Sequence, residues 1–277
     1  MILNFAAEND RIMVILITGI SSGFGRAMAQ RFQTDGHAVY GTVRRDVEPI
    51  PGVHYLRADV RDSASVQRAV AAVQAAEGRI DVLVNNAGMG IGGPAEFTAE
   101  ADVQLQMDTN FMGQVRFIRA VLPVMRRQGK GKILCLSSIG GVMGLPFQGF
   151  YSASKFALEG FCEALQIEVR PQGIQVVLIE PGDFSTGFTA ARIKQVSEEA
   201  AAVYPSLLRS VRSFEKDEQA GLKPEYLACK VAKIVRKKHP KFRYVIATFI
   251  QRLSIPLKRI LPARTFVRVL SMFYSVK

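Results

Sequence analysis

The sequence alternates short apolar runs with longer segments of helical periodicity, and this alternation constrains the fold more than any other feature. Apolar runs of strand length occupy residues 12–17, 37–43, 53–58, 80–85, 131–137, 174–180 and 243–247. Helical patterns separate them, at residues 23–34, 63–77, 101–128, 151–169 and 224–238. Strands that are apolar on both faces are typical of a parallel sheet covered by helices on each side. The chain is therefore predicted to be an α/β protein with one doubly wound, mostly parallel, seven-stranded sheet.

Two segments depart from the alternation. Residues 187–222 insert polar, helical sequence after the sixth apolar run, and residues 248–277 continue past the last run. Ligands of open α/β sheets bind beyond the carboxyl ends of the strands, so the first segment is placed to cover a ligand site. We expect one catalytic domain over residues 1–247, in which 187–222 cover the substrate, and a basic amphipathic C-terminal extension over residues 248–277.

The positive charge of the chain is concentrated at its C-terminal end. The net charge is +12, and residues 223–277 alone carry 14 lysines and arginines against the single acid Glu225. The last helical pattern places Arg264 and Arg268 along one side, with apolar residues elsewhere. A basic, apolar-rich helix suits the surface of an anionic membrane, although the same helix could pack on the domain or on a sister subunit. No nucleic-acid-binding motif accompanies the charge, so no nucleic-acid partner is expected.

Cysteine usage and the N-terminal sequence bear on the compartment. Cys135, Cys162 and Cys229 lie far apart, without metal-ligand spacing, and the histidines are scattered. We therefore expect no metal site. We also expect a reducing, cytoplasmic location, in which the protein could bind peripherally to a membrane. The N-terminal stretch before residue 12 carries charged residues and does not resemble a secretory signal. No stretch reaches the roughly 18 apolar residues of a membrane-spanning helix.

A glycine-rich turn follows the first apolar run. The segment TGISSGFG at residues 18–25 has the spacing G-x-x-x-G-x-G and opens the first helical pattern. Such glycines allow a tight turn and let backbone approach a pyrophosphate at a helix N-terminus. In this context the turn predicts a Rossmann-type dinucleotide-binding domain. Its candidate cofactor-binding residues are Gly19, Ser21, Ser22, Gly23, Phe24 and Gly25.

The end of the second apolar run predicts which nucleotide is bound. Units that bind NAD usually place an acid about 20 residues after the glycines, to hold the ribose hydroxyls. Here Thr42 and Val43 occupy that place and Arg44 and Arg45 follow. An arginine pairs with a ribose 2′-phosphate, which an acid would repel. The sequence therefore predicts NADP(H), with Arg44 reading the phosphate.

Two further strand ends supply cofactor contacts. Asp59 and Val60 follow the third run, where a carboxylate can accept a hydrogen bond from an adenine amino group. Asn86, Ala87 and Gly88 follow the fourth run, with a side-chain amide and a glycine that lets backbone lie against a cofactor. Both sets are expected at the same edge of the sheet as the glycine turn.

Several motifs together resemble the short-chain dehydrogenase/reductase family over residues 12–190. These are the glycine turn, Asn85-Asn86-Ala87-Gly88, Asn110, Ser138, Tyr151-x-x-x-Lys155 and Pro181-Gly182, in that order. The segment around Tyr151 is similar to the 17β-hydroxysteroid and retinol dehydrogenase branch. The resemblance implies an oxidoreductase that moves a hydride between a nicotinamide and an alcohol or ketone. It also implies that Asn110 holds a water that relays protons to Lys155.

The chemistry of the motif agrees with that resemblance. Reducing a ketone leaves an alkoxide that needs a proton, and Tyr151 can supply it. Lys155 lies one helical turn further on the same face, where its charge is expected to lower the pKa of the phenol and its amine to reach the cofactor ribose. Ser138 is expected to polarise the substrate carbonyl. Pro181, Gly182 and Thr186 follow the sixth run, where Thr186 is placed to bond the nicotinamide carboxamide.

The expected substrate wall is apolar and comes from the loop after Ser138 and from the covering segment. An apolar wall favours a hydrophobic alcohol or ketone, such as a steroid, a retinoid, a long-chain carbonyl compound or a sphingoid-type lipid. By analogy with the family, we expect a homodimer or homotetramer formed through the helices at residues 101–128 and 151–170. The candidate substrate residues are Val142, Met143, Leu145, Phe147, Phe184 and Phe188.

Two other functions remain open at this point. One is a reductase of 3-oxoacyl-thioesters or of general carbonyl compounds. The other is a non-catalytic protein that senses NADP, since a fold does not fix a function. Retention of Ser138, Tyr151 and Lys155 favours catalysis over sensing.

Overall fold

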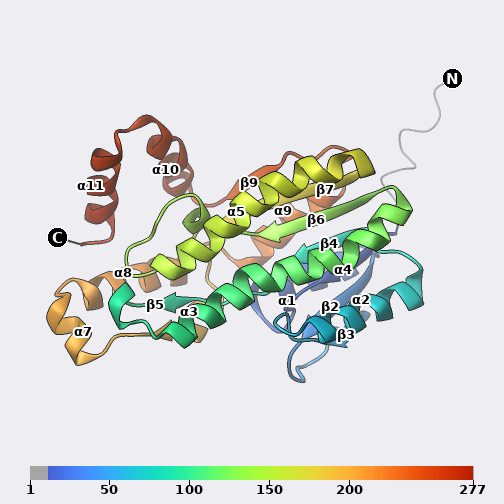
Figure 1. Cartoon of the computed structure of the whole chain (residues 1–277), viewed down its shortest axis with the longest axis horizontal. Coiled ribbons are helices and arrows are strands. Elements are labelled where there is room, and N and C mark those ends of the chain that lie inside the picture. Colours follow the sequence, from blue (N-terminus) through green and yellow to red (C-terminus); the bar gives the residue numbers. More distant parts are fainter. Residues whose placement is uncertain (1–11, 277) are drawn as a thin grey trace.

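The computed structural model describes residues 12–276 and contains one seven-stranded sheet (Figure 1). The strand order is β3-β2-β1-β4-β6-β7-β9, and every neighbouring pair is parallel. This confirms the predicted doubly wound α/β fold. The strands are β1 (Val14–Ile17), β2 (Ala38–Val43), β3 (Val53–Arg57), β4 (Val82–Asn85), β6 (Gly131–Leu136), β7 (Ile174–Pro181) and β9 (Arg243–Ile246).

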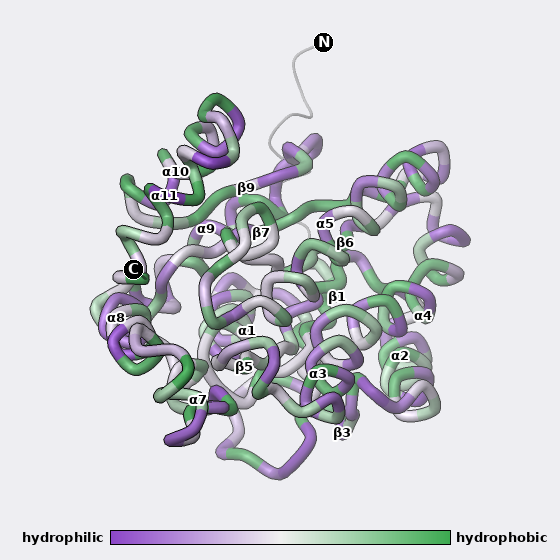
Figure 2. Tube along the Cα trace, turned by 60° about the vertical axis from the view of Figure 1, so that its left-hand side comes forward, coloured by the Kyte–Doolittle hydropathy of each residue, from purple (hydrophilic) through white to green (hydrophobic). Residues whose placement is uncertain are grey.

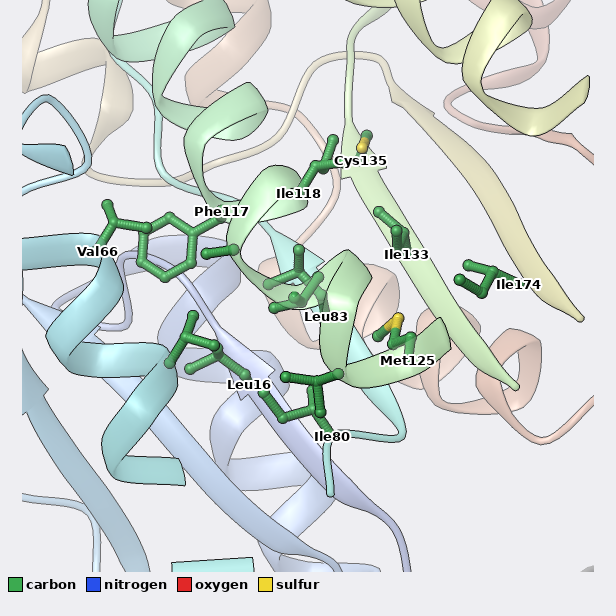
Figure 3. Packing of buried hydrophobic residues seen from close by; sticks show 14 of the residues in the cluster. Leu16, Val66, Ile80, Leu83, Phe117, Ile118, Met125, Ile133, Cys135 and Ile174 are labelled. Carbon is green, nitrogen blue, oxygen red and sulfur yellow. The ribbon is translucent and has the colours of Figure 1, made fainter. Parts of the chain in front are cut away.

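Helices cover both faces of the sheet because alternate side chains of each strand point to opposite sides. Leu16 of β1 and Leu83 of β4 lie on the face of the sheet that is covered by α2 (Ser63–Glu77), α4 (Gly113–Gln128) and α5 (Gly149–Val169). Phe117 of α4 packs in the same apolar cluster (Figure 3). Ile15 and Ile17 point the other way, toward α1 (Gly23–Thr34) and α9 (Pro224–Val235). The two apolar layers fix the sheet in place, and with it the positions of the strand ends.

The helix predicted at residues 101–128 is not regular, and the prediction is wrong in its middle. The structure has α3 (Glu100–Met107), then the π-turn η2 (Asp108–Met112), then α4. A π-turn inserts one residue into the helical ladder and commonly marks a functional position. Gly113 follows it against Val60, where a Cβ would lie 2.7 Å from Val60 Cγ2. The turn directs Asn110 into the interior, where it is fully buried.

The segment after β7 forms a lid over the carboxyl ends of the strands. It begins with α6 (Phe188–Ala191) and β8 (Ile193–Lys194), and β8 pairs with β5 (Ile91–Gly92) in a small second sheet that the sequence did not predict. It continues with α7 (Glu198–Val203) and α8 (Leu207–Gln219). Short 3-10 turns, at Ala95–Phe97, Ile139–Gly141 and Arg170–Gln172, complete the connections.

The chain ends in a helical hairpin of α10 (Phe249–Ile260) and α11 (Ala263–Phe273), which stands at the edge of the molecule beside the lid (Figures 1 and 2). Phe266 and Tyr274 are buried on its inner side, in a third apolar cluster shared with α8. None of the helices in the described part of the chain has the length and apolar character needed to span a membrane. The expectation about the N-terminal segment lies outside the described residues.

Candidate active site

One cavity of about 560 Å³ runs along the carboxyl ends of the strands. It extends from the glycine turn before α1, past Tyr151, to α8 and Tyr274. Every predicted cofactor residue except Gly25 lines it, as do Ser138, Tyr151 and Lys155. Predicted residues from seven separate segments of the chain therefore meet at one edge of the sheet, as parallel strand ends should.

The glycine turn is shaped by contacts that leave no room for side chains. A Cβ on Gly25 would lie 2.1 Å from the Gly19 carbonyl oxygen, so Gly25 supports the turn from behind rather than facing the cavity. Gly19 adopts φ +72°, a conformation that favours glycine. Asn86 fastens the turn by donating from Nδ2 to the carbonyl oxygens of Thr18 and Gly19, at 2.9 and 3.0 Å.

The N-terminus of α1 fits an anionic group. Its N-cap residue Ser22 makes no side-chain capping bond, and the first turn contains no acid. The first amide groups of a helix have no partners within the helix and lie at the positive end of its dipole. Both Ser22 and Gly23 line the cavity, so these residues fit the pyrophosphate of a dinucleotide.

The adenosine end of the cavity is basic. Arg44 and Arg45 are exposed at its wall. Asp59 is held by Arg61 at 2.7 Å, and this hydrogen bond lowers the pKa of the carboxyl. Arg61, which sequence reasoning missed, thus adds a third cation and neutralises the nearby acid. Thr42, which stands where an acid would hold a ribose, accepts from the Gly19 amide at 3.1 Å through its hydroxyl.

Ser138 and Tyr151 flank Gly140 in the middle of the cavity. A Cβ on Gly140 would lie 3.3 Å from Tyr151 Cε1 and 3.4 Å from Ser138 Oγ, so only a glycine fits between them easily. Ser138 follows β6, and its hydroxyl accepts from the Gly140 amide at 3.0 Å. Lys155 lies one turn after Tyr151 on α5, with Nζ 5.8 Å from the centre of the phenol ring. It donates to the Leu136 carbonyl oxygen at 2.7 Å.

The pKa of Tyr151 differs from the expectation. Removal from water raises the pKa of the phenol to about 12, while the Ser138 hydroxyl acts in the opposite direction. Burial also lowers the pKa of Lys155, to about 8. The expected lowering of the phenol pKa by Lys155 is not seen: the groups that lower it are the Ser138 hydroxyl and Arg192, and desolvation outweighs both. A neutral phenol with a high pKa keeps its proton at neutral pH, and so it retains a proton that it can donate.

Asn110 lies behind the cavity and not on its wall. Its amide group bonds the backbone of Met89 twice, accepting from the nitrogen at 2.8 Å and donating to the oxygen at 2.9 Å. It also donates to Ser154 Oγ at 3.1 Å. Gly88 separates it from Lys155: a Cβ there would lie 3.3 Å from Asn110 Oδ1 and 3.9 Å from Lys155 Nζ. Asn110 thus fixes the loop after β4 against α5; its part in a proton relay stays a prediction.

The apolar wall differs in part from the predicted one. Leu145, Phe184 and Phe188 line the cavity, and the Phe188 ring centroid lies 5.9 Å from that of Tyr151. The other three predicted residues, Val142, Met143 and Phe147, do not line it. They belong to the third apolar cluster instead, because the loop after Ser138 turns its apolar side toward the lid and the hairpin.

Sequence reasoning missed two wall residues, one from the lid and one that follows the hairpin. Phe214 of α8 and Tyr274 after α11 line the cavity, beside Ile193 of β8, an apolar residue that the covering segment is expected to add to the wall. The signal for Phe214 was available, since α8 carries buried side chains at Leu207, Val211 and Phe214, an amphipathic spacing. Tyr274 had no such signal, because its place depends on the path of the hairpin.

Two carboxyl groups interrupt the apolar wall near Tyr151. Asp183 and Glu218 both line the cavity, and both raise the pKa of Tyr151. Burial, followed by repulsion from neighbouring acids, raises the pKa of Asp183 to about 7. Glu218 accepts hydrogen bonds from Thr189, at 2.5 Å, and from Arg192. Glu218 is paired with the buried Arg192, whereas the Asp183 carboxyl accepts from the neutral side-chain amide of Gln251, so an ammonium group would be favoured beside Asp183.

Comparison with known proteins identifies the family. The family model described as short chain dehydrogenase matches residues 13–197. The chain is a short-chain dehydrogenase. It is 48% identical over 265 residues to 3-ketodihydrosphingosine reductase of Bacteroides thetaiotaomicron, covering 95% of this chain and 98% of that protein. It is 45% identical over 191 residues to 17-beta-hydroxysteroid dehydrogenase type 1 of Homo sapiens, covering 63% of this chain and 58% of that protein.

Comparison with solved structures supports the same family. The crystal structure of a short-chain dehydrogenase from Streptomyces avermitilis superposes with a TM-score of 0.78 at 30% identity, over 96% of this chain and 97% of that one. The resemblance inferred from the motifs, including the hydroxysteroid and retinol dehydrogenase branch, is confirmed. As a short-chain dehydrogenase, the protein is an oxidoreductase that acts on an alcohol or carbonyl group with a nicotinamide cofactor.

Proposed function

We propose that this short-chain dehydrogenase uses NADP(H) to reduce a hydrophobic ketone with a long apolar chain, and that Tyr151 is the general acid. One observation carries the proposal: a single cavity joins the glycine turn, the Ser138–Tyr151–Lys155 group and an apolar lid. A cofactor and a lipophilic ketone can therefore lie end to end in it. The same observation weighs against a protein that only senses NADP, which has no need of a substrate wall.

In the proposed reaction, a nicotinamide cofactor held by the glycine turn, Lys155 and Thr186 would supply the hydride that the carbonyl carbon receives. Ser138 donates a hydrogen bond to the carbonyl oxygen and so favours the developing negative charge. Tyr151, neutral at the working pH, gives its proton to that oxygen. Lys155 donates to the Leu136 carbonyl oxygen, and we expect its other N–H groups to serve the cofactor ribose and the phenol. The apolar lid excludes water from the reacting atoms.

The preference for NADP(H) rests on the cations at the adenosine end. Arg44 and Arg45 lie at the wall, and Arg61 neutralises Asp59, the acid of that region that lines the cavity. A 2′-phosphate would find two free guanidinium groups and little repulsion. The measurement is kcat/KM with NADPH and with NADH on the same ketone. A clear preference for NADH would reject this part of the proposal.

The substrate class is argued from the cavity wall and from the relative. A sphingoid ketone carries an ammonium next to its carbonyl group and a long alkyl chain. The cavity offers Asp183 and Glu218 near Tyr151 and an apolar wall that includes Phe188 and Phe214. A steroid or retinoid ketone has no cation for the two carboxyl groups. We therefore propose an amino ketone of the sphingoid type, and the relative named 3-ketodihydrosphingosine reductase supports this choice.

A substrate comparison tests the proposal. Purified protein is given NADPH with 3-ketodihydrosphingosine, a steroid ketone, retinal or an acetoacetyl thioester, and the loss of NADPH absorbance is followed. We expect the sphingoid ketone to have the highest kcat/KM. A higher value for the thioester would favour the alternative, a reductase of 3-oxoacyl-thioesters.

We also propose a homodimer or homotetramer formed through α4 and α5, with peripheral contact to membranes through the C-terminal extension. Large apolar side chains are exposed on α5, where Phe156 is 41% exposed and Ile167 is 71% exposed. Such residues are typical of a subunit interface. Light scattering of the purified protein gives the subunit number, and a monomer at all concentrations would reject this part of the proposal.

A further inference from the structure

The hairpin of α10 and α11 has two unlike sides. Its inner side closes the cavity: Phe266 and Tyr274 are buried, and Ser210 of α8 donates to the Tyr274 carbonyl oxygen at 2.7 Å. Gln251 of α10 bonds Asp183, at the end of β7, at 2.5 Å. The hairpin is therefore held to the active-site end of the molecule by specific contacts, and its remaining side faces outward.

The outward side is apolar. Among the described residues, sixteen large hydrophobic side chains are exposed, and nine of them lie on these two helices. Soluble surfaces scatter such residues singly, so their concentration here indicates a binding surface. They are Phe249, Ile250, Leu253, Leu257 and Ile260 on α10, and Val267, Val269, Met272 and Phe273 on α11.

On α10 these side chains form a single stripe. Phe249, Leu253 and Ile260 recur at helical spacing, with Ile250 and Leu257 beside them. Phe249, Ile250 and Ile260 are 74%, 69% and 79% exposed, so the body of the protein does not cover the stripe.

The charge of the hairpin selects the partner. Five basic residues lie on α10 and α11, and no acid occurs anywhere after Glu225. A second copy of the same surface would bring like charges together, which disfavours self-association through it. An anionic lipid surface offers both an apolar interior for the stripe and opposite charge for the basic side chains. The basic residues are Arg252, Arg259, Arg264 and Arg268, together with Lys258, whose amine donates to the Val142 carbonyl oxygen and so faces the body of the protein.

We infer that the outward side of the α10–α11 hairpin docks on an anionic membrane and so brings the cavity to the lipid surface. This inference rests on the proposed function, because a long-chain ketone dissolves in the bilayer and must be taken from it. The hairpin links the two places directly: Tyr274, immediately after α11, lines the cavity. Docking therefore lays one wall of the substrate cavity beside the membrane.

Flotation with vesicles tests the inference. The full chain is mixed with vesicles of phosphatidylcholine alone or with added phosphatidylglycerol. We expect flotation with the anionic vesicles, weakened by salt because surface charge pairs are screened. The double variant Ile250→Glu/Ile260→Glu should lose flotation. The control Val203→Glu/Tyr226→Glu adds the same charge at exposed positions of α7 and α9, and it should float like the unaltered protein.

Activity on a water-soluble short-chain ketone separates the two proposals. Both double variants should keep their turnover of that ketone, because none of the substituted residues lines the cavity. If no ketone is reduced, the proposed function fails while flotation still tests the docking surface. If the hairpin variant floats as well as the control, the docking inference is wrong. The docking inference is also wrong if the unaltered protein does not float with anionic vesicles. If, in addition, the hairpin variant forms smaller oligomers than the unaltered protein in the absence of lipid, the surface is a subunit contact.

Discussion

The two ends of the cavity are built in different ways. At the nucleotide end, the wall comes from strand ends and the turns that follow them, where the Asn86 side chain donates to the backbone carbonyl oxygens of Thr18 and Gly19 and a Cβ on Gly25 would clash with the Gly19 carbonyl oxygen. At the substrate end, it comes from the lid and the hairpin, held by side chains such as Gln251 and Arg192. A turn whose backbone is closely packed tolerates little change, whereas bonds between side chains of the lid and the hairpin can be exchanged one by one. The difference suggests that the first end fixes the chemistry and the second selects the substrate.

The largest expected effect lies where the two ends meet. Tyr151→Phe removes the proton donor and keeps the ring that packs on Phe188. We expect kcat to fall by about 10²–10⁴-fold, the usual contribution of general acid catalysis. NADPH binding, measured by nucleotide fluorescence, should stay unchanged. Turnover close to that of the unaltered protein would remove Tyr151 from the mechanism.

The second-largest effect is expected for a substitution at the nucleotide end of the cavity. Gly25→Ala places a methyl group 2.1 Å from the Gly19 carbonyl oxygen, so the turn must shift. We expect NADPH affinity to fall by about 100-fold or more, since a displaced turn loses several phosphate contacts. Gly160→Ala is the matched control, because nothing lies within 4 Å of its Cβ position. Calorimetric titration with NADPH compares the two, and equal affinities would show that the turn adapts.

A smaller effect is expected on the preference for NADPH over NADH when Arg44 is replaced. Arg44→Ala removes one proposed charged partner of the 2′-phosphate, and we expect a loss of about 10–100-fold in kcat/KM with NADPH. The value with NADH should change little. Arg68→Ala, an exposed arginine of α2 outside the cavity, should leave both values alone. An unchanged ratio in the Arg44 variant would mean that other residues read the phosphate.

The smallest effect is expected at the substrate end. Asp183→Asn keeps the shape of the side chain and removes its negative charge, so we expect KM for a sphingoid ketone to rise by about tenfold. KM for the same ketone without its amine should not change. This comparison separates recognition of the ammonium from damage to the bond with Gln251, which would weaken both substrates.

The contrast between the two ends also explains what the sequence could predict. The glycine turn and the Tyr151–Lys155 pair are local patterns, because their geometry follows from a turn and from one helical period. The π-turn at Asn110 carries no such pattern and arises from packing between the loop after β4 and α5. Met143 and Phe147 are predicted to line the substrate wall because they are apolar and close to Ser138 in sequence. In the structure they belong to a cluster that includes Tyr204 of the lid and Ile255 of the hairpin, both more than fifty residues away, and no local signal reveals those partners.

The position of Tyr274 has a practical and evolutionary consequence. A residue near the end of the chain forms part of the reaction chamber, although the residues proposed for catalysis all lie before residue 160. Exchanging the hairpin and Tyr274 between homologues would therefore exchange the proposed membrane-docking surface together with one residue of the cavity wall, and would leave the residues proposed for catalysis unchanged. It follows that a purification tag is better fused at the opposite terminus, and that homologues can diversify their tails without rebuilding their chemistry.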